Sequence, residues 1–368
     1  MKKFLAFFFS FVSLYSYSQT TTYRIVGKVV DSETKQPLQG ASVYAQNTTI
    51  GTATSAEGVF KIDLPTGGYE LAATFTNYYS DTKRVTSSET GDKEVVFELK
   101  QKEKEMVDVV VKNTYEVADG WEKYGDFFLE NFIGKTANSS QCTIKNKEVL
   151  RFFFYKRKNR LKVLASAPIE VENNALGYRI KYSLDSFTHE YNSGISLYSG
   201  APLFEEMTPA DSLQKAKWEA ARDVAYKGST LHFMRSLYKK KLKEEGFEIQ
   251  FLVKANDKES AVTLKDQYKA MNYSMDDSTH ILEVKPTNPS VAIIYKNAKP
   301  EESYMAANTG VNPAFQLSVM NFNPNESIGI EQNGYFFEQN DVTIGNYWAW
   351  ERVADMVPYD YSAHLLPK

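Results

Sequence analysis

The sequence is poor in the residues that build metal sites and disulfide frameworks. Its 368 residues include one cysteine, Cys142, and four histidines. One cysteine can form neither an internal disulfide nor a paired-cysteine metal site, so the fold must rest on packing. We expect Cys142 to be a buried, small apolar residue, and we expect no metal.

Sequence motifs of the common enzyme classes are also missing. There is no G-x-S-x-G nucleophile elbow, no P-loop and no glycine-rich dinucleotide fingerprint. The net charge of −3 at pH 7 offers no basic field that would attract nucleic acid. We therefore assign no catalytic residue, and we expect no cofactor and no nucleic-acid partner.

Long apolar runs are confined to the start of the chain. Lys2-Lys3 is followed by an apolar run, Phe4 to Leu14, that is too short to span a bilayer. Small residues at positions 16 and 18 predict cleavage before Gln19, so residues 1–18 are interpreted as a signal peptide. No cysteine follows the run, so a lipid anchor is not expected. We expect an exported protein, periplasmic, associated with the outer membrane or secreted.

Short alternating apolar runs come next, separated by turns rich in Gly, Pro, Asn and Ser. Strands are predicted near residues 24–30, 42–46 and 59–64, and more follow up to residue 99. Seven short strands in about 80 residues are typical of a small antiparallel β-sandwich, which we place at residues 20–100. The 24 tyrosines and 23 phenylalanines of the chain suit half-buried strands, which favour aromatic side chains.

The stretch from residue 23 to residue 64 closely resembles the carboxypeptidase-like regulatory domain, a transthyretin-like module of many Bacteroidetes envelope proteins. The matching residues are Gly27, Val29, Asp31, Pro37, Leu38, Gly40, Ala41, Val43, Thr52, Gly58 and Phe60. The resemblance implies a seven-stranded transthyretin-like sandwich. It also implies a module without catalytic residues of its own.

A charged link leads into the second domain. Residues 101–112 are predicted to be a linker and a first strand, and residues 113–368 a domain of unknown function. Residues 119–135 carry apolar side chains at helical spacing, which predicts a helix. A second helical segment is predicted from Thr208, as N-cap, to Phe247, with an interruption at Gly228-Ser229.

Strand patterns fill most of the remainder. The Pro286–Pro289 segment predicts the turn of one hairpin and Asn333-Gly334 the turn of another. A short helix is predicted near Trp348 to Met356. The predicted fold class is therefore α+β, mainly β: the N-terminal sandwich is followed by a larger antiparallel-sheet domain with two or three helices.

The second domain resembles one that accompanies this module in a group of uncharacterised Bacteroidetes secreted proteins. The runs that carry the resemblance are NSSQCTIKNKEVLRFFF, NNALGYRIKYSLDSF, YKGSTLHFMRSL and YWAWERVADMVPYDY. The group has no known activity, so the resemblance implies none.

The name of the N-terminal module makes zinc carboxypeptidase chemistry worth testing. His280 and Glu283 form an H-x-x-E pair, and His364 could supply a second histidine. The separation is short for that family, and no glutamate follows His364 to act as general base. We interpret the pair as structural.

Two groups of residues are candidates for ligand binding. The first group is Arg222, His232 and Arg235, of which the last two lie three apart on one helical face and could bind an anionic group together. The alternative is that the arginines pair with carboxylates while neighbouring aromatic rings fill the core.

The second group is Trp348, Trp350 and Arg352, near the C-terminus. Glu351 and Asp355 flank Arg352 at helical spacing, a pattern that more often indicates a surface helix than a site.

These observations favour a non-catalytic envelope protein with a binding or assembly role, whose partner would be a protein, a peptide or a glycan. Two alternatives remain open at this point. One is a hydrolase whose site is assembled from distant residues of the second domain, and the other is a purely structural envelope module.

Overall fold

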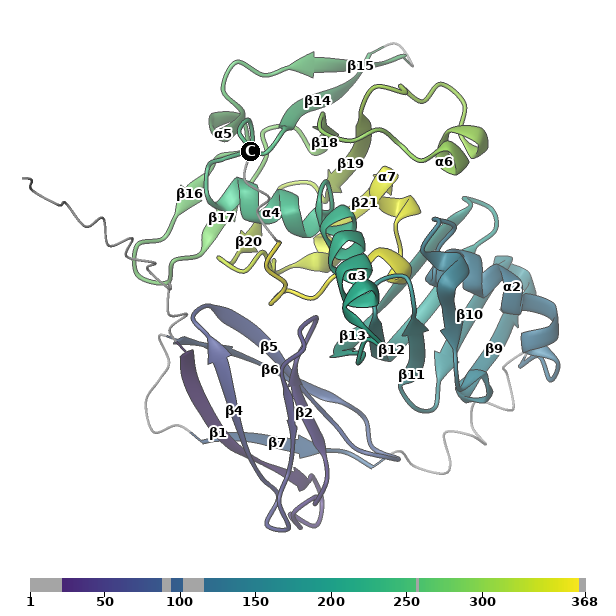
Figure 1. Ribbon diagram of the computed structural model, residues 1–368, viewed down its shortest axis with the longest axis vertical. Helices are drawn as coiled ribbons and strands as arrows, with labels where there is room; N and C mark the ends of the chain where they lie inside the picture. The colour runs from purple at the N-terminus through teal and green to yellow at the C-terminus, as the bar shows by residue number, and fades with distance from the viewer. Residues whose placement is uncertain (1–21, 88–93, 102–115, 256–257, 364–368) are drawn as a thin grey trace, which may run out of the picture.

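The computed structural model describes residues 22–87, 94–101, 116–255 and 258–363. The predicted signal peptide, most of the predicted link and His364 lie outside these residues. Within them the chain forms a β-sandwich, drawn at the bottom of Figure 1, and a larger sheet-rich part above it. The fold class predicted from the sequence, α+β and mainly β, is confirmed. No helix in the described ranges is both long and apolar enough to cross a membrane.

The N-terminal sandwich has two sheets, in the strand orders β4-β1-β7 and β3-β2-β5-β6. Its strands are β1 (Thr22–Asp31), β2 (Ser42–Ala45), β3 (Gly51–Ala53), β4 (Val59–Pro65), β5 (Gly68–Thr74), β6 (Asp81–Thr86) and β7 (Val95–Leu99). All neighbours are antiparallel except β1 and β7, which are parallel. The seven predicted strands are confirmed.

Side-chain alternation builds the sandwich core. Along β1, buried and solvent-facing side chains alternate because successive residues of a strand point to opposite faces. Phe60 and Phe97 meet between the sheets with ring centroids 6.0 Å apart. Gly27 is required beside them, because a Cβ there would lie 2.1 Å from the carbonyl oxygen of Val95.

The next part of the chain forms a six-stranded antiparallel sheet. Five strands follow the order β8-β11-β12-β10-β9, and β13 pairs with the other side of the long strand β12. The strands are β8 (Cys142–Ile144), β9 (Leu150–Tyr155), β10 (Arg160–Ala165), β11 (Ile169–Asn173), β12 (Tyr178–Glu190) and β13 (Ile195–Glu206). The 3-10 turn η2 (Ser139–Gln141) precedes β8, and two more, η3 (Lys147–Val149) and η4 (Lys156–Lys158), lie on either side of β9.

Helix α2 (Gly120–Phe132) covers one face of this sheet and confirms the first predicted helix. Phe128 and Phe132 are fully buried. Phe128 meets Phe187 edge to face, with ring centroids 5.2 Å apart, and Phe132 meets Tyr182 in the same way at 5.0 Å. This aromatic layer anchors the helix on the sheet.

The second predicted helical segment is two helices, α3 (Ser212–Tyr226) and α4 (Thr230–Tyr238). The break at Gly228-Ser229 is confirmed, but the predicted N-cap at Thr208 is wrong. Asp211 is the N-cap, and its carboxylate accepts a hydrogen bond from the backbone N–H of Gln214 at 2.7 Å. The segment also ends at Tyr238 rather than at Phe247, which instead begins β14.

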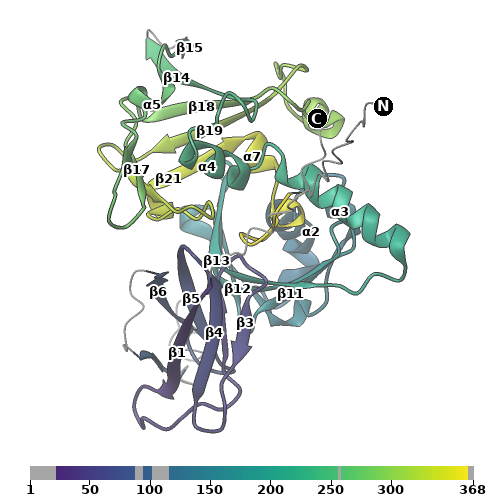
Figure 2. The ribbon, with the colours of Figure 1, turned by 60° about the vertical axis from the view of Figure 1, so that its left-hand side comes forward.

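A second core lies above, between two further sheets and α4 (Figure 2). The five-stranded sheet has the order β15-β14-β18-β19-β21 and the three-stranded sheet the order β16-β17-β20. The strands are β14 (Phe247–Ala255), β15 (Lys258–Thr263), β16 (Ser274–Met275), β17 (Leu282–Val284), β18 (Ser290–Tyr295), β19 (Gln316–Phe322), β20 (Ile328–Ile330) and β21 (Val342–Asn346). The short helices and turns are α5 (Gln267–Ala270), α6 (Glu302–Ala307), η5 (Gln339–Asp341), α7 (Tyr347–Trp350) and η6 (Val353–Asp355).

Two hairpin predictions have different outcomes here. The Pro286–Pro289 segment does not close a hairpin, because β17 pairs with β16 and β20 while β18 pairs with β14 and β19 in the other sheet. The two strands are neighbours in sequence only. The turn at Asn333-Gly334 is confirmed, with Gly334 at φ +91° and an antiparallel bridge between Ile330 and Phe336.

The sandwich is joined to the six-stranded sheet through backbone pairing. Thr48 forms a parallel bridge with Leu203 of β13, and the Phe204 N–H donates to the Thr48 carbonyl oxygen at 2.9 Å. The Tyr44 hydroxyl donates to the carbonyl oxygen of Ala201 at 3.1 Å. Figure 2 shows β3 of the sandwich lying near β12 and β13. The sandwich is thereby continuous with the second part of the chain.

The C-terminal segment, residues 351–361, forms hydrogen bonds to several separate parts of the structure. Its hydrogen bonds reach Ile133 after α2, Asn173 of β11, Asp223 of α3, Arg235 of α4, and Asn47 and Thr49 of the sandwich. The segment therefore holds three packed units in one arrangement.

Candidate functional site

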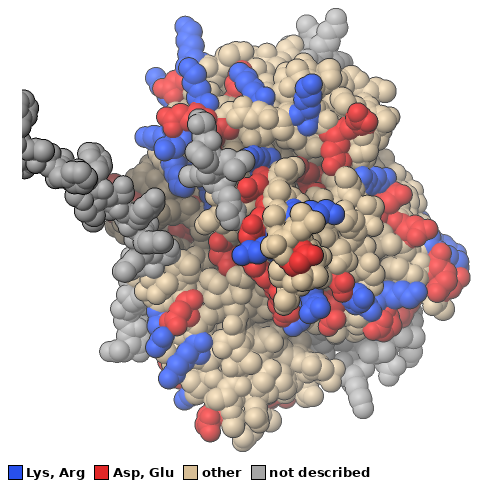
Figure 3. Space-filling model, in the orientation of Figure 1, with Lys and Arg blue, Asp and Glu red and all other residues tan. Residues whose placement is uncertain are grey.

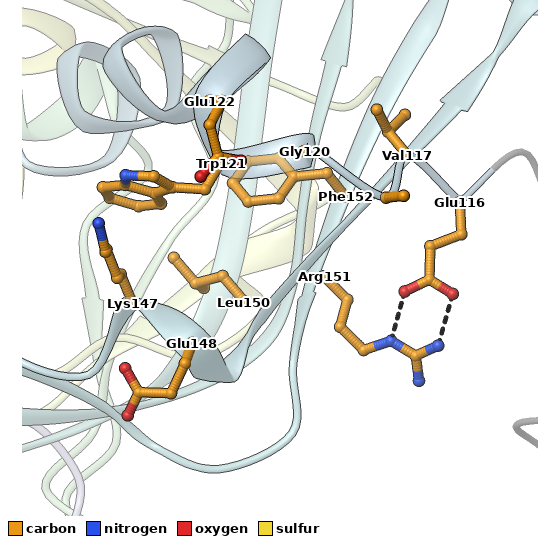
Figure 4. A pocket seen from close by; sticks show the side chains of 11 residues that line it. Glu116, Val117, Gly120, Trp121, Glu122, Lys147, Glu148, Leu150, Arg151 and Phe152 are labelled. Atoms are coloured by element: carbon orange, nitrogen blue, oxygen red, sulfur yellow. Dashed lines mark hydrogen bonds and ion pairs between the residues drawn. The ribbon is translucent and has the colours of Figure 1, made fainter.

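Two adjoining cavities lie where the chain enters the second part of the molecule. The first, of about 310 Å³, lies between Trp121 and Phe152 on one side and Lys147 and Leu150 on the other (Figure 4). The second, of about 430 Å³, lies along Tyr124 and Phe154 and shares residues 116–118 with the first. We call the two cavities together the α2–β9 groove. Both cavities are open to solvent.

The wall shared by the two cavities is a short stretch of chain laid along the edge of β9. Glu116 forms an antiparallel bridge with Phe153, and the Val117 N–H donates to the Phe152 carbonyl oxygen at 2.9 Å. Glu116 also accepts two hydrogen bonds from the guanidinium group of Arg151, at 2.8 and 2.6 Å. This forked pair is the geometry in which arginine binds a carboxylate most specifically.

A glycine brings α2 close to this wall. A Cβ on Gly120 would lie 2.6 Å from the Cβ of Phe152, so a larger residue could not occupy the position without moving β9. Asp119 precedes it and forms an ion pair with Lys123 at 2.8 Å. Local sequence thus sets the first turn of α2 directly over the groove.

Aromatic rings form the apolar lining. Tyr124 is stacked on Phe154 with ring centroids 6.0 Å apart and an interplanar angle of 11°, and Trp121 meets Phe152 edge to face at 6.4 Å. Trp121 and Tyr124 are each partly exposed. The Lys147 ammonium group points at the Trp121 ring, 5.4 Å from its centroid (Figure 4). The aromatic part of the lining is therefore packed in place and partly accessible.

The charges around the groove balance. Four carboxylates and four cations line the two cavities: Glu116, Asp119, Glu122, Glu148, Lys123, Lys147, Arg151 and Lys156. The hydrogen bond from Arg151 lowers the pKa of Glu116, and the hydrogen bond from Lys123 lowers the pKa of Asp119, so both carboxylates are ionised at neutral pH. On the face shown in Figure 3, acidic and basic side chains are likewise interspersed.

The groove lacks the Ser–His and Cys–His pairs of many hydrolases. Of the described residues, those that line it include no serine, threonine, cysteine or histidine, and its acidic groups are the four carboxylates named above. No group of three His, Cys, Asp or Glu side chains in the described ranges could hold a metal ion.

The first predicted ligand group is used inside the protein. Arg222 is buried, stacks over the Tyr178 ring at 3.9 Å, and donates to the carbonyl oxygens of Leu176 and Gly177 at 2.7 and 3.1 Å. It also reaches Glu206 at 3.3 Å. This guanidinium group therefore binds the turn between β11 and β12 to α3.

Arg235 has a similar structural role. Its three nitrogens donate to the backbone carbonyl oxygens of Asn333, Tyr361 and Tyr359 at 2.8, 2.8 and 2.6 Å. The sequence-based alternative, in which arginine pairs with carboxylates, does not describe this residue. The guanidinium instead binds backbone oxygens and fixes the C-terminal segment to α4.

His232 lies beside Arg235 on α4 but faces a different environment. Its Nδ1 accepts from the Gly228 N–H at 3.1 Å, and its Nε2 lies 3.3 Å from the Glu245 carboxylate. Burial lowers the pKa of the imidazole, against the opposing effect of Glu245. With Nδ1 accepting, the neutral ring donates from Nε2, and both nitrogens are engaged.

The second predicted ligand group is also buried in contacts. Trp348 donates from Nε1 to the Gly228 carbonyl oxygen at 2.7 Å, within the core around α4. Trp350 meets Tyr304 edge to face at 5.4 Å, and its Nε1 is buried without a hydrogen-bond partner among the described residues. Arg352 lies over the Tyr198 ring at 5.7 Å. None of the six predicted ligand residues lines the α2–β9 groove.

The interpretation of Glu351 and Asp355 as one surface helix is wrong. Helix α7 ends at Trp350, and Asp355 is 9% exposed in the separate turn η6. Its carboxylate accepts from Thr136 Oγ1 at 2.8 Å and from Asn138 Nδ2 at 2.9 Å. Burial raises the pKa of Asp355 to about 6 despite these donors. Burial and the neighbouring carboxylates of Asp355 and Glu301 raise the pKa of Glu351 well above its usual value.

The remaining candidate residues lie in structural settings. His280 is exposed at φ +55° in the turn before β17, and Glu283 accepts from the Ser327 hydroxyl at 3.0 Å. Cys142 is partly rather than fully buried. Burial raises the pKa of its thiol to about 12, so the thiol is unreactive at neutral pH.

The α2–β9 groove was missed by sequence reasoning. Trp121 and Tyr124 share the helical periodicity of the core residues Phe128 and Phe132, so pattern alone assigns all four to one buried face. The available signal was Asp119-Gly120-Trp121, because a glycine in the first turn of a helix indicates close approach of another element.

Comparison with known proteins assigns the N-terminal part. Residues 25–111 match the family model of the CarboxypepD_reg-like domain. The N-terminal sandwich is a CarboxypepD_reg-like domain. No curated protein matches the chain.

One solved structure similar to this chain is that of a 9R-lipoxygenase from Cyanothece PCC8801, at 9% sequence identity and a TM-score of 0.15. The alignment covers 59% of this chain and 48% of that chain, so it spans about half of the lipoxygenase. A likeness at this TM-score supports no statement about the fold or function of this protein.

Proposed function

We propose that this protein is an exported, non-catalytic binding protein of the cell envelope, in which the CarboxypepD_reg-like domain is a scaffold and the α2–β9 groove is the binding site. The observation that carries the proposal is the groove itself. It joins two cavities, aromatic rings packed on one another form part of its lining, and no Ser–His or Cys–His pair occurs among its described residues.

The way in which the CarboxypepD_reg-like domain is attached supports a scaffold role. The carboxylate of Asp360 accepts from the Thr49 N–H at 3.0 Å, and Arg84 forms an ion pair with the buried Glu331 at 2.5 Å. The same Arg84 guanidinium lies over the Phe337 ring at 3.6 Å. Contacts of this kind hold the sandwich against the second part rather than leave it on a loose tether.

The hydrolase alternative has weaker support. The carboxylates with raised pKa, Glu351 and Asp355, would be the candidate acids, because perturbed carboxylates are common in active sites. Neither lines the α2–β9 groove, and Asp355 is already bound by two side-chain donors. Buried ion and hydrogen-bond networks perturb pKa values in the same way without catalysis.

The test is binding and turnover of one ligand panel by the purified protein. The panel comprises neutral hexasaccharides, alginate oligomers and ten-residue peptides, with calorimetry for binding and chromatography for product formation. The groove variant combines Trp121→Ala with Lys147→Ala, and the matched control combines Leu213→Ala on α3 with Lys269→Ala on α5.

We expect at least one ligand class to bind without turnover, and the groove variant to lose about tenfold or more in affinity, as expected for an aromatic hot spot. The control variant should bind like the natural protein. Product formation would overturn the non-catalytic assignment, and equal binding by both variants would exclude the groove as the site. Binding to no member of the panel would favour the purely structural role.

A further inference from the structure

We infer that the α2–β9 groove binds a neutral glycan chain, with the rings of Trp121 and Tyr124 as stacking platforms. This inference rests on the proposed function and names the ligand class of the same site. It follows from three features: the balance of charges in the groove, the backbone pairing that already occupies the edge of β9, and the packing that holds the two rings in place.

Charge balance argues for a neutral ligand. Arg151 is bound in the forked pair with Glu116, and Lys123 is paired with Asp119. The other two cations of the lining, Lys147 and Lys156, are matched by two further carboxylates, Glu122 and Glu148. A ligand of either charge would therefore meet as many like charges as opposite ones. A neutral ligand can use the pairs as fixed hydrogen-bond donors and acceptors without breaking them.

The edge of β9 argues against an extended peptide. Peptides that bind sheets usually add a strand to an open edge, so that main-chain hydrogen bonds supply the affinity. Here the edge at Phe152 and Phe153 is already paired with residues 116 and 117 of the same chain. A peptide therefore cannot add a strand at this part of β9, because its backbone groups are already bonded to residues 116 and 117.

The rings argue for a ligand with an apolar face and a polar rim. Tyr124 is held parallel to Phe154, and Trp121 is held by Phe152 and approached by the Lys147 ammonium group. A sugar ring has C–H groups on one face, which pack on an aromatic ring, and hydroxyls around its edge, which need donors and acceptors. Glu122 and Glu148 supply acceptors on the lining of the first cavity. Because the rings are already fixed, little side-chain entropy is lost on binding.

The arrangement of the two cavities argues for a chain rather than a single sugar. They share residues 116–118, with one ring platform in each: Trp121 in the first and Tyr124 in the second. The two residues are three positions apart on α2, so their side chains lie on adjacent turns of one helical face. A ligand that occupies both platforms must extend across the shared wall.

The experiment is calorimetric titration with cellohexaose, maltohexaose, mannohexaose, chitohexaose and xylohexaose, and with alginate hexamer and ten-residue peptides as the other arms. The variants are Trp121→Ala, Trp121→Phe and Tyr124→Ala, with Leu213→Ala as control. Circular dichroism at each temperature of titration checks that every variant is folded, and Trp121→Phe keeps a ring where the alanine variant could disturb α2.

We expect at least one neutral hexasaccharide to bind more tightly than its own disaccharide. Trp121→Ala and Tyr124→Ala should each weaken binding about tenfold or more, and Trp121→Phe should weaken it less, because an aromatic face remains. Groove-dependent binding of alginate or peptides alone would overturn the glycan inference and leave the proposed binding function standing. Failure of every arm to bind in a groove-dependent way would overturn both.

Discussion

Replacing Asp355 by asparagine should abolish a pH-dependent loss of stability that this buried carboxyl causes. Its pKa is about 6 in the folded protein, against an ordinary value of 3.8. A raised pKa means that the folded state binds the proton more tightly than the unfolded chain does. The contribution of Asp355 to stability is therefore favourable at low pH and is lost as the pH rises from about 4 to above 6.

The size of the effect follows from the shift. A difference of about 2 pKa units at about 1.4 kcal/mol per unit corresponds to about 3 kcal/mol of unfolding free energy between the two pH limits. An asparagine amide keeps the hydrogen bonds, because its oxygen can accept from Asn138 and its N–H₂ can donate to the Thr136 hydroxyl. The variant should thus be more stable than the natural protein at pH 7.5, with the difference shrinking toward pH 4.

Urea unfolding, followed by tryptophan fluorescence from pH 4 to pH 8, measures this difference directly. Comparing the two proteins at each pH cancels the titration of groups that do not interact with Asp355, including His232, whose lowered pKa destabilises the folded state as the pH falls. Glu351→Gln serves as a companion variant, because the carboxylates of Asp355 and Glu301 both raise the pKa of Glu351. A stability difference that stays constant across the pH range would refute the reasoning.

Four further expectations concern the rest of the chain. Arg235→Ala should lower the unfolding free energy by about 3 kcal/mol or more, because a charged donor to three backbone oxygens is lost. Urea unfolding beside the exposed Arg179→Ala checks this, and a loss equal to the control would contradict it. Tyr44→Phe should cost about 1 kcal/mol through its lost bond to Ala201, and an unchanged midpoint in the same assay would argue against that docking contact. Truncation after Asn346 should unfold the protein, since it removes Trp348 and the C-terminal segment; an unchanged melting temperature would exclude this role. The exported protein should begin at Gln19 by mass spectrometry, and retention of the first 18 residues would rule out cleavage there.

The sequence predicted helices, strands and turns well wherever a residue type or pattern strongly favours one local structure. Glycine at 228 interrupts a helix, Asn333-Gly334 closes a turn, and alternation in β1 places every second residue in the sandwich core. These outcomes depend on neighbours in the chain, so the local pattern carries enough information. The helix start was harder, because Thr208, Asp211 and Ser212 can all cap a helix and only the packing of α3 selects among them.

The sequence could not predict which groups the buried arginines bind or which strands pair with one another. Arg222 and Arg235 look like ligand-binding groups by composition, and their use as clamps on backbone oxygens depends on turns about 45 to 125 residues away. In the same way, β17 and β18 carry adjacent strand patterns but belong to different sheets. Strand pairing over such distances is decided by which apolar faces can be buried together, and the sequence pattern of one strand does not contain that choice.

By itself the sequence determined the mainly β composition of the fold, the sandwich at its N-terminal end and the absence of disulfides. Each of these follows from alternation, turn residues or a residue count. The tertiary structure alone decided where the α2–β9 groove lies and how the C-terminal segment joins three packed units. Trp121 packs against the edge of the core and also lines the groove, where Gly120 lets α2 approach β9 closely. That placement depends on contacts across the fold and has no counterpart in local periodicity.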